Sequence, residues 1–247
     1  MSSKNRTLYL IIFVLLFCIF WHVLSEFSVF LPGPISVLWD LVWLFRNGVI
    51  WHILVSAERV FLSLELSFVF GVSLGLLSAK IGFLDLLFHT TIIPLIEAVP
   101  PLCWIVICVF IVGMGEVTVL FVLSVVLIQF FLVNTIEGIK NIDRNLVEMA
   151  RTFTLDKTRI LRHVELYMMA PYLWAAIRVA YGVSWKVLVL AEMFGASEGI
   201  GYLMNQAYST LSVLRVISLS ALLVLLFSLG DLLILRRVER RFRKWQR

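Results

Sequence analysis

The sequence is dominated by apolar runs that are close to the length of a membrane-spanning helix. Such a helix needs about 20 apolar residues to cross roughly 30 Å of hydrocarbon. The chain has 247 residues, is 61% hydrophobic and has a mean hydropathy of +1.00, far above that of soluble domains. These features predict an all-α polytopic membrane protein. We expect one transmembrane domain over 1–247, with spans at approximately 8–24, 60–78, 86–112, 117–135, 173–194 and 216–235.

Two of these predicted spans carry residues that indicate how they pack. Gly71 and Gly75 lie four residues apart in the second span, a spacing that permits close helix packing. Pro94 and the pair Pro100-Pro101 interrupt the third span, and prolines inside a span release backbone groups that need other partners. We therefore expect the third span to be kinked. The first span is long for a signal peptide, and no small-residue cleavage site follows it.

The distribution of positive charge predicts the orientation of the chain. Of its 21 lysines and arginines, sixteen fall on one side if the six spans are correct and the N-terminus is inside. Because positive residues accumulate on the cytoplasmic side of membrane proteins, we expect both termini to be cytoplasmic. The net charge of +5 is explained by this topology, so the sequence does not indicate nucleic-acid binding.

The longest charged segment between apolar blocks runs from Asn141 to Pro171, within the predicted cytoplasmic loop 136–172. Its apolar residues recur at spacings of three and four, which predicts two short amphipathic helices with a break near Thr154 and Leu155. A helix pair with one apolar stripe and one charged face is suited to docking against a soluble partner. Glu148 has an alternative role as a surface carboxylate paired with Arg151 or Arg144.

The sequence contains no pattern that predicts catalysis in this chain. It has no G-x-x-x-x-G-K-[ST] phosphate loop, no nucleophile with a paired base, and no metal-ligand spacing. The three cysteines lie in apolar context without disulfide or metal-site spacing. We expect no catalytic residue, no metal site and no cofactor in this chain.

The loop sequence resembles that of a known family. Glu148-Met149-Ala150-Arg151, then Val164, Leu166 and Ala170-Pro171, are similar to the "EAA" loop of permease subunits in bacterial binding-protein-dependent ABC importers. The resemblance runs from Leu31 to Ile234 and is closest to the branch that handles nitrate, taurine and alkanesulfonates. Further matching segments are Leu31-Pro32, Val99-Pro100-Pro101, Gly113-Met114-Gly115, Ala191-Glu192-Met193 and Gly199-Ile200-Gly201-Tyr202.

The resemblance implies a type I ABC importer permease fold in a bacterial inner membrane. It implies that the loop couples transport to an ATPase through Glu148, Ala150, Arg151, Thr154, Leu155, Val164 and Leu166. The implied partners are two cytoplasmic ATP-binding subunits, which hold ATP and Mg²⁺, a second copy of the permease as a homodimer, and an extracytoplasmic solute-binding protein. Thr154 and Tyr167 stand where the family pattern has glycine and proline.

Ionisable residues inside predicted spans are candidates for the translocation path, because a charge at mid-bilayer costs roughly 2.5 to 3.5 kcal/mol. The candidates are Lys186, Glu97, Glu192 and the neighbouring Trp185. The alternatives are a structural ion pair between spans or a position near the membrane interface for each charge, including a pair between Glu97 and Lys186, and core packing for Trp185. The sequence also leaves open a secondary transporter or channel driven by an ion gradient. Lys186 favours an anionic solute, but the sequence does not identify the substrate.

Overall fold

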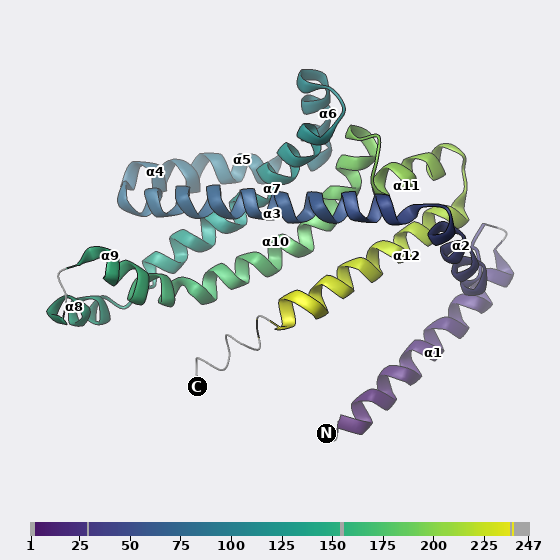
Figure 1. The fold of residues 1–247 in the computed structure, drawn as a ribbon, viewed down its shortest axis with the longest axis horizontal. Coiled ribbons are helices and arrows are strands. Elements are labelled where there is room, and N and C mark those ends of the chain that lie inside the picture. The colour runs from purple at the N-terminus through teal and green to yellow at the C-terminus, as the bar shows by residue number, and fades with distance from the viewer. Residues whose placement is uncertain (1–2, 29, 154–155, 238, 240–247) are drawn as a thin grey trace. The chain divides into compact units, whose positions relative to one another are not determined.

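The computed structural model describes residues 3–28, 30–153, 156–237 and 239, and across them the chain is helical without a β-strand (Figure 1). The prediction of an all-α fold is therefore confirmed. By contact the chain forms two compact units, Leu54–Gly201 and the combination of Met1–Ile53 with Tyr202–Arg247.

The α-helices are α1 (Ser3–Phe27), α2 (Pro34–Arg46), α3 (Val49–Lys80), α4 (Gly82–Leu87), α5 (Ile93–Ala98), α6 (Pro101–Val112), α7 (Glu116–Lys140), α8 (Arg144–Phe153), α9 (Lys157–Ile160), α10 (Leu166–Gly195), α11 (Ile200–Ser209) and α12 (Val213–Gly230). The described residues also contain three π-helical segments, which are η1 (Phe88–Ile92), η2 (Leu161–Glu165) and η3 (Asp231–Leu235).

In the unit that contains both ends of the chain, α2 packs against α12. Pro34 begins α2 at a position where its missing N–H costs nothing, because the first helical N–H groups have no partner inside the helix. Arg215 of α12 bonds Asp40 of α2 at 3.0 Å and lies 4.1 Å from the centre of the Trp43 ring. An ion pair and a cation–π contact therefore join these two helices.

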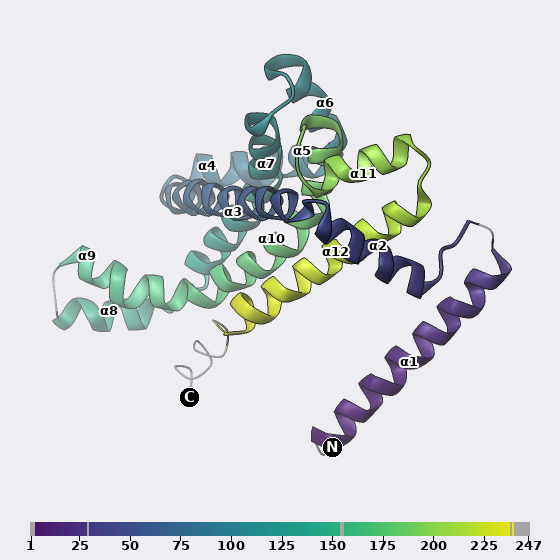
Figure 2. The ribbon, with the colours of Figure 1, turned by 45° about the vertical axis from the view of Figure 1, so that its right-hand side comes forward.

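The core of the unit 54–201 lies where α7 packs along α10, with α3 beside them (Figure 2). Leu127 and Phe131 of α7 pack against the small residues Ala176 and Ala180 of α10, and all four are buried. The Phe131 ring also meets Phe68 of α3 edge to face at 5.5 Å. Small residues on α10 thus let α7 approach closely, as is common between membrane helices.

The close packing predicted for Gly71 and Gly75 is confirmed. A Cβ atom on Gly71 would lie 2.6 Å from the Phe131 Cβ, and one on Gly75 would lie 2.6 Å from the Thr135 Cβ. Both distances are shorter than two carbon atoms can approach without displacement of a helix. The two glycines therefore allow α3 to lie against α7.

The kink predicted in the third span is present as a break between α5 and α6. The helices 82–98 and 101–112 meet at 85°, and Val99 between them is extended, with φ −87° and ψ 116°. The residue before a proline avoids the helical region because the proline ring clashes with it. Pro100 and Pro101 therefore end α5 and begin α6.

Four helices in the described part of the chain are long and apolar enough to cross a membrane, and the bent pair would make five. They are Val49–Lys80, Glu116–Lys140, His163–Gly195 and Val213–Leu233. The second span was predicted to begin at residue 60, whereas its helix begins at Val49 and includes Arg59. The crossing of the first predicted span, which lies within α1, and the extent of a single domain over 1–247 stay predictions.

The charged segment from Asn141 to Pro171 differs from its prediction in one respect. The first amphipathic helix is α8, as expected, but the second, α9, runs without a break through η2 into α10. A π-helical segment adds one residue to a helical turn and changes the direction of a side-chain face without ending the helix. The polar residues after Lys157 therefore extend the fifth predicted span at its N-terminal end.

Candidate functional site

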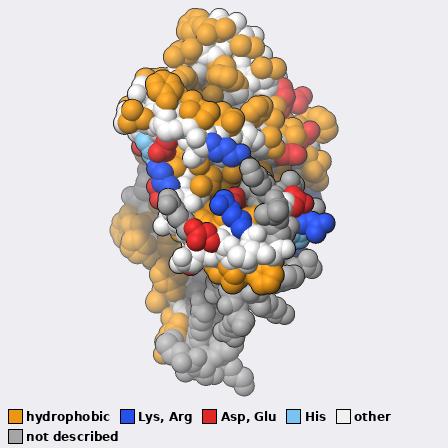
Figure 3. Space-filling model, turned by 90° about the vertical axis from the view of Figure 1, so that its left-hand side faces the viewer, with side chains coloured by type: hydrophobic (Ala, Val, Ile, Leu, Met, Phe, Trp, Pro, Cys, Tyr) orange, Lys and Arg blue, Asp and Glu red, His pale blue; other side chains and the backbone are white. Residues whose placement is uncertain are grey.

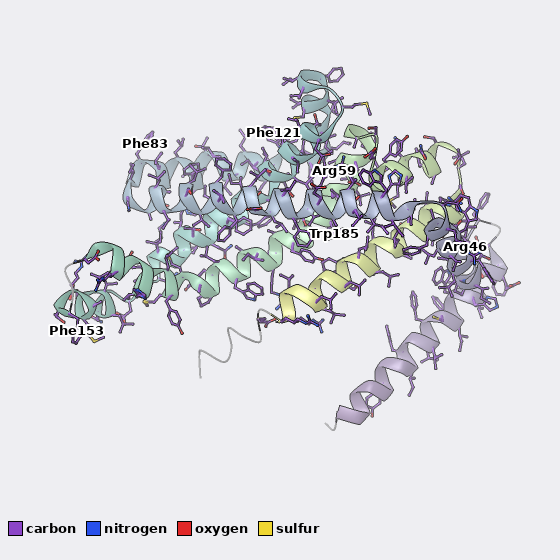
Figure 4. All side chains as sticks on the ribbon, viewed as in Figure 1. Arg46, Arg59, Phe83, Phe121, Phe153 and Trp185 are labelled. Carbon is purple, nitrogen blue, oxygen red and sulfur yellow. The ribbon has the colours of Figure 1, made fainter. Side chains whose placement is uncertain are left out.

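The α8 helix presents an exposed apolar face at one end of the unit 54–201. Leu146, Met149 and Phe153 recur at spacings of three and four residues and so share one side of the helix. All three are exposed, Phe153 to 84%, and Figure 4 shows Phe153 at the end of this unit. On the side of the molecule that carries α8 and α9, charged side chains of both signs lie beside hydrophobic ones (Figure 3). An apolar stripe set among charges on a surface helix is typical of a protein interaction site.

The charged residues of α8 are also available for contact. Glu148 and Arg151 are exposed, and neither forms an ion pair with another described residue. The surface pair between Glu148 and Arg151 is therefore absent from this part of the chain, and the side chain of Arg144, the other partner considered, lies outside those described. Ala150 is half-buried beside them.

The remaining predicted coupling residues follow α8. Val164 lies in η2 and Leu166 begins α10, and both are half-buried. Thr154 and Leu155 lie outside the described residues. Of the predicted set, the structure thus places Glu148, Ala150 and Arg151 together on α8 and the other two described residues beyond α9.

A cavity of about 610 Å³ lies behind α8. It is lined by Ser78, Ala79, Gly82, Asp85, Ile139, Lys140, Ile142, Val147, Glu148, Arg151 and Glu165. In its wall the Lys140 ammonium forms an ion pair with the Asp85 carboxylate at 2.9 Å, and Asp85 also lies 3.5 Å from His89. This contact joins α4 to the last residue of α7, just before α8 begins.

At the opposite ends of α7 and α10, a set of charged residues surrounds Arg59. Its Nη1 donates to the Glu192 carboxylate at 2.9 Å, and its Nη2 donates to Glu116 at 2.7 Å. The Arg59 Nε donates to Glu116 as well, at 2.9 Å. Arg59 is 4% exposed and Glu192 0%, whereas Glu116 is half exposed. We call Arg59, Glu116, Glu192 and Ser56 the Arg59 network.

The Arg59 network also binds the backbone between α10 and α11. The Gly201 N–H donates to Glu192 at 2.8 Å, and the Ile200 N–H donates to the Ser56 hydroxyl at 2.9 Å. Ser56 in turn donates to Glu192 at 2.8 Å, and Arg59 donates to the Glu198 carbonyl at 2.8 Å. The first N–H groups of a helix lack partners inside the helix and favour negative charge. At the start of α11, Ser56 and Glu192 accept the hydrogen bonds of these N–H groups, and Glu192 also provides negative charge.

Two glycines let the backbone approach Glu192 this closely. Gly199 has φ +110°, a left-handed conformation, and a Cβ there would collide with the Glu192 carboxylate. A Cβ on Gly201 would lie 2.7 Å from the Glu192 Cβ. The segment Gly199-Ile200-Gly201 is therefore shaped around one buried carboxylate.

The four predicted path residues lie in different environments. Lys186 and Glu97 are exposed, and they form no ion pair with each other among the described residues, contrary to the pairing considered above. Trp185 is buried and meets the Tyr181 ring edge to face at 6.2 Å (Figure 4). Glu192 belongs to the Arg59 network, so the structural ion pair considered as its alternative is present.

Reasoning from sequence did not connect Arg59 and Glu116 with Glu192. Arg59 lies 57 residues from Glu116 and 133 from Glu192, so no local pattern relates them. The available signal was a lone arginine next to a long apolar run, which requires a partner if it enters the membrane. No group of three or more metal-binding side chains occurs within the described ranges.

These features define a membrane protein of several helical spans, with an exposed amphipathic helix between two of them. A family model described as "Binding-protein-dependent transport system inner membrane component" matches residues 71–244, and the chain belongs to this family. It is thus a permease subunit of a binding-protein-dependent ABC importer, in the branch with the nitrate and taurine permeases.

Similar proteins cover most of the chain. The taurine transport system permease protein TauC of Escherichia coli (strain K12) is 27% identical, over 98% of this chain and 91% of the relative. The nitrate import permease protein NrtB of Leptolyngbya laminosa is 29% identical, over 77% of this chain and 71% of the relative. A solved structure titled as an inward facing conformation of the MetNI methionine ABC transporter has a TM-score of 0.64 and 21% identity. The comparison covers 82% of this chain and 98% of that one, which confirms the fold.

Proposed function

We propose that α8 is the element through which this permease is coupled to a cytoplasmic ATP-binding subunit. The observation that carries this proposal is the exposed face of Leu146, Met149 and Phe153, next to the charges of Glu148 and Arg151, which form no ion pair with the side chains that the structure describes. Protein interfaces commonly have aromatic and aliphatic residues at their centre and charged residues at their rim. The exposed face of α8 has this composition. The connection of α8 to α7 and, through α9, to α10 supports the transmission of partner movement to these two spans.

The proposed assembly contains two copies of this chain, two ATP-binding subunits and an extracytoplasmic solute-binding protein. The description of the family names a binding protein, which supports the presence of the solute-binding protein in the assembly. The sequence contains no phosphate loop, which supports placing ATP and Mg²⁺ on the partner subunits. We propose that this chain carries out no catalysis and holds no cofactor. The positive charge near α8 and at the C-terminus supports a cytoplasmic location for both termini.

We propose a small solute with an anionic group as the substrate. The similar permeases are named for taurine, nitrate and bicarbonate transport, and each of these solutes carries a negative group. The exposed ammonium of Lys186, which forms no ion pair within the described residues, supports a place for this residue along the path. Glu97 is the second candidate, whereas the surroundings of Glu192 and Trp185 support structural roles for them.

Co-purification of the ATP-binding subunit tests the proposed coupling. Phe153→Asp places a charge at the most exposed residue of the apolar face, and we expect the amount of co-purified ATPase to fall about tenfold or more, since interface anchors contribute about 2 kcal/mol or more. Thr152→Asp is the matched control, because Thr152 is exposed one residue away on another side of α8. Equal recovery of the ATPase with both variants would rule out this face as the docking site.

A further inference from the structure

The two spans that flank α8 and α9 are α7 and α10, and the end of each span that is farther from α8 and α9 lies at the Arg59 network. The α7 helix begins at Glu116, a member of the network, and ends at Lys140, four residues before α8 begins at Arg144. The α10 helix continues from α9 and η2 and ends at Gly195, just after Glu192. The Gly115 N–H donates to the Gly195 carbonyl at 2.7 Å, which joins these distant ends directly.

The α7–α10 pair is packed so that its two ends move together. Leu127 and Phe131 of α7 are buried against Ala176 and Ala180 of α10. Interiors packed in this way transmit displacement instead of absorbing it, because they contain little free volume. Movement at α8 would therefore reach Glu116 and Glu192.

Arg59 is the residue that links this helix pair to other elements. It belongs to α3, it binds one carboxylate from each helix of the pair, and it holds the Glu198 carbonyl of the segment before α11. Arginine suits this position because its planar guanidinium carries five N–H donors in a fixed arrangement. A lysine has one ammonium group and cannot reach three separate acceptors in the same geometry.

We infer that Arg59 is a positioning residue for coupled transport. Through Glu116 and Glu192 it joins α3 and the segment 196–199 to the α7–α10 pair, so that movement of α8 changes the face of the permease that meets the solute-binding protein. This inference rests on the proposed function, in which α8 binds the ATPase, and it places the binding protein at the face of the permease farthest from α8. Reciprocally, docking of the binding protein at that face alters the ATPase.

The test uses the complete transporter, reconstituted with its ATP-binding subunit and solute-binding protein. We would measure ATP hydrolysis with and without solute-loaded binding protein, and express stimulation as the ratio of the two rates. In Arg59→Lys and Glu116→Ala we expect this ratio to fall by about fivefold or more, the lower end of typical allosteric coupling. The control is Glu58→Ala, which removes an exposed carboxylate from the residue next to Arg59 and should leave the ratio unchanged.

The second variant keeps the inference testable if Arg59→Lys does not assemble. Glu116 is half exposed, so its truncation removes one arm of the network without opening a buried cavity. An unchanged ratio in Glu116→Ala, or an equal fall in Glu58→Ala, would overturn the inference. Failure of the proposed function itself is recognised separately, because the wild-type transporter would then show no ATP-driven uptake.

Discussion

The Arg59 guanidinium in α3 lies 2.9 Å from the Glu192 carboxylate in α10, and both side chains are almost completely buried. Burial of either charge alone would be unfavourable, because water that solvates it is lost. Here Glu116, Ser56 and the N–H of Gly201 complete the hydrogen bonding of the pair. The pair therefore fixes α3 against α10 at one defined position.

Truncation of Glu192 should destabilise the protein strongly. Glu192→Ala leaves Arg59 with one half-exposed carboxylate, Glu116, and loss of one member of a buried ion pair costs about 3 kcal/mol or more. We expect a clear fall in the midpoint of thermal unfolding in detergent. Glu97→Ala, at an exposed carboxylate without an ion-pair partner in the described part of the chain, serves as the control and should unfold close to wild type. Equal midpoints for the two variants would contradict the role assigned to Glu192.

Substitution of Gly199 should cost more than substitution of another left-handed glycine. Gly199 and Gly48 have φ of +110° and +86°, so alanine at either position carries backbone strain of about 1–2 kcal/mol. Only at Gly199 does the added Cβ meet the Glu192 carboxylate, whereas Gly48 has open space. We expect Gly199→Ala to lower the unfolding midpoint more than Gly48→Ala does. A larger effect at Gly48 would show that the segment 196–199 is not held against Glu192.

The ion pair between Lys140 and Asp85 should contribute much less than the Arg59 network. Both partners are partly exposed, 48% for Lys140 and 28% for Asp85, and exposed pairs contribute about 1 kcal/mol or less. Lys140→Ala should therefore shift the unfolding midpoint only slightly, and the shift should shrink at high salt because solvent ions screen the pair. A loss as large as that of Glu192→Ala would refute this ranking.

Replacement of Lys186 should reduce transport without affecting stability. Lys186→Met keeps the length of the side chain and removes its charge, and we expect uptake of an anionic solute to fall about tenfold, the equivalent of one hydrogen bond to a charged group. The unfolding midpoint should stay unchanged, since Lys186 is exposed and makes no ion pair among the described residues. Lys80→Met, at the exposed end of α3, is the control. Normal uptake by Lys186→Met would remove this residue from the path.

The features that could be predicted from the sequence are those that depend on local residues. Long apolar runs require helices in a membrane, and Pro100-Pro101 must interrupt one of them. The spacing of Leu146, Ala150 and Phe153 predicts an apolar face on α8, and in the structure the exposed part of that face consists of Leu146, Met149 and Phe153. The resemblance in the loop led to the correct family for the same reason, because its motif is contiguous.

The features that could not be predicted depend on residues far apart in the chain. Arg59 lies outside the predicted second span, 60–78, but two distant carboxylates neutralise its charge and its helix extends back to Val49. The continuation of α9 into α10 depends on η2, a π-helical segment that has no clear sequence signal. Glu97 and Lys186 are both ionisable and lie in the third and fifth predicted spans, yet the sequence gives no register between those spans.

The most direct test of the central claim is solute uptake into proteoliposomes. We would compare vesicles that contain this chain with its ATP-binding subunit and external solute-binding protein against vesicles that contain this chain alone. An ATP-driven permease coupled through α8 should accumulate solute only in the complete system with ATP and Mg²⁺, and Phe153→Asp should abolish that uptake while Thr152→Asp retains it. Accumulation by the chain alone, driven by an imposed ion gradient and unaffected by Phe153→Asp, would contradict the account.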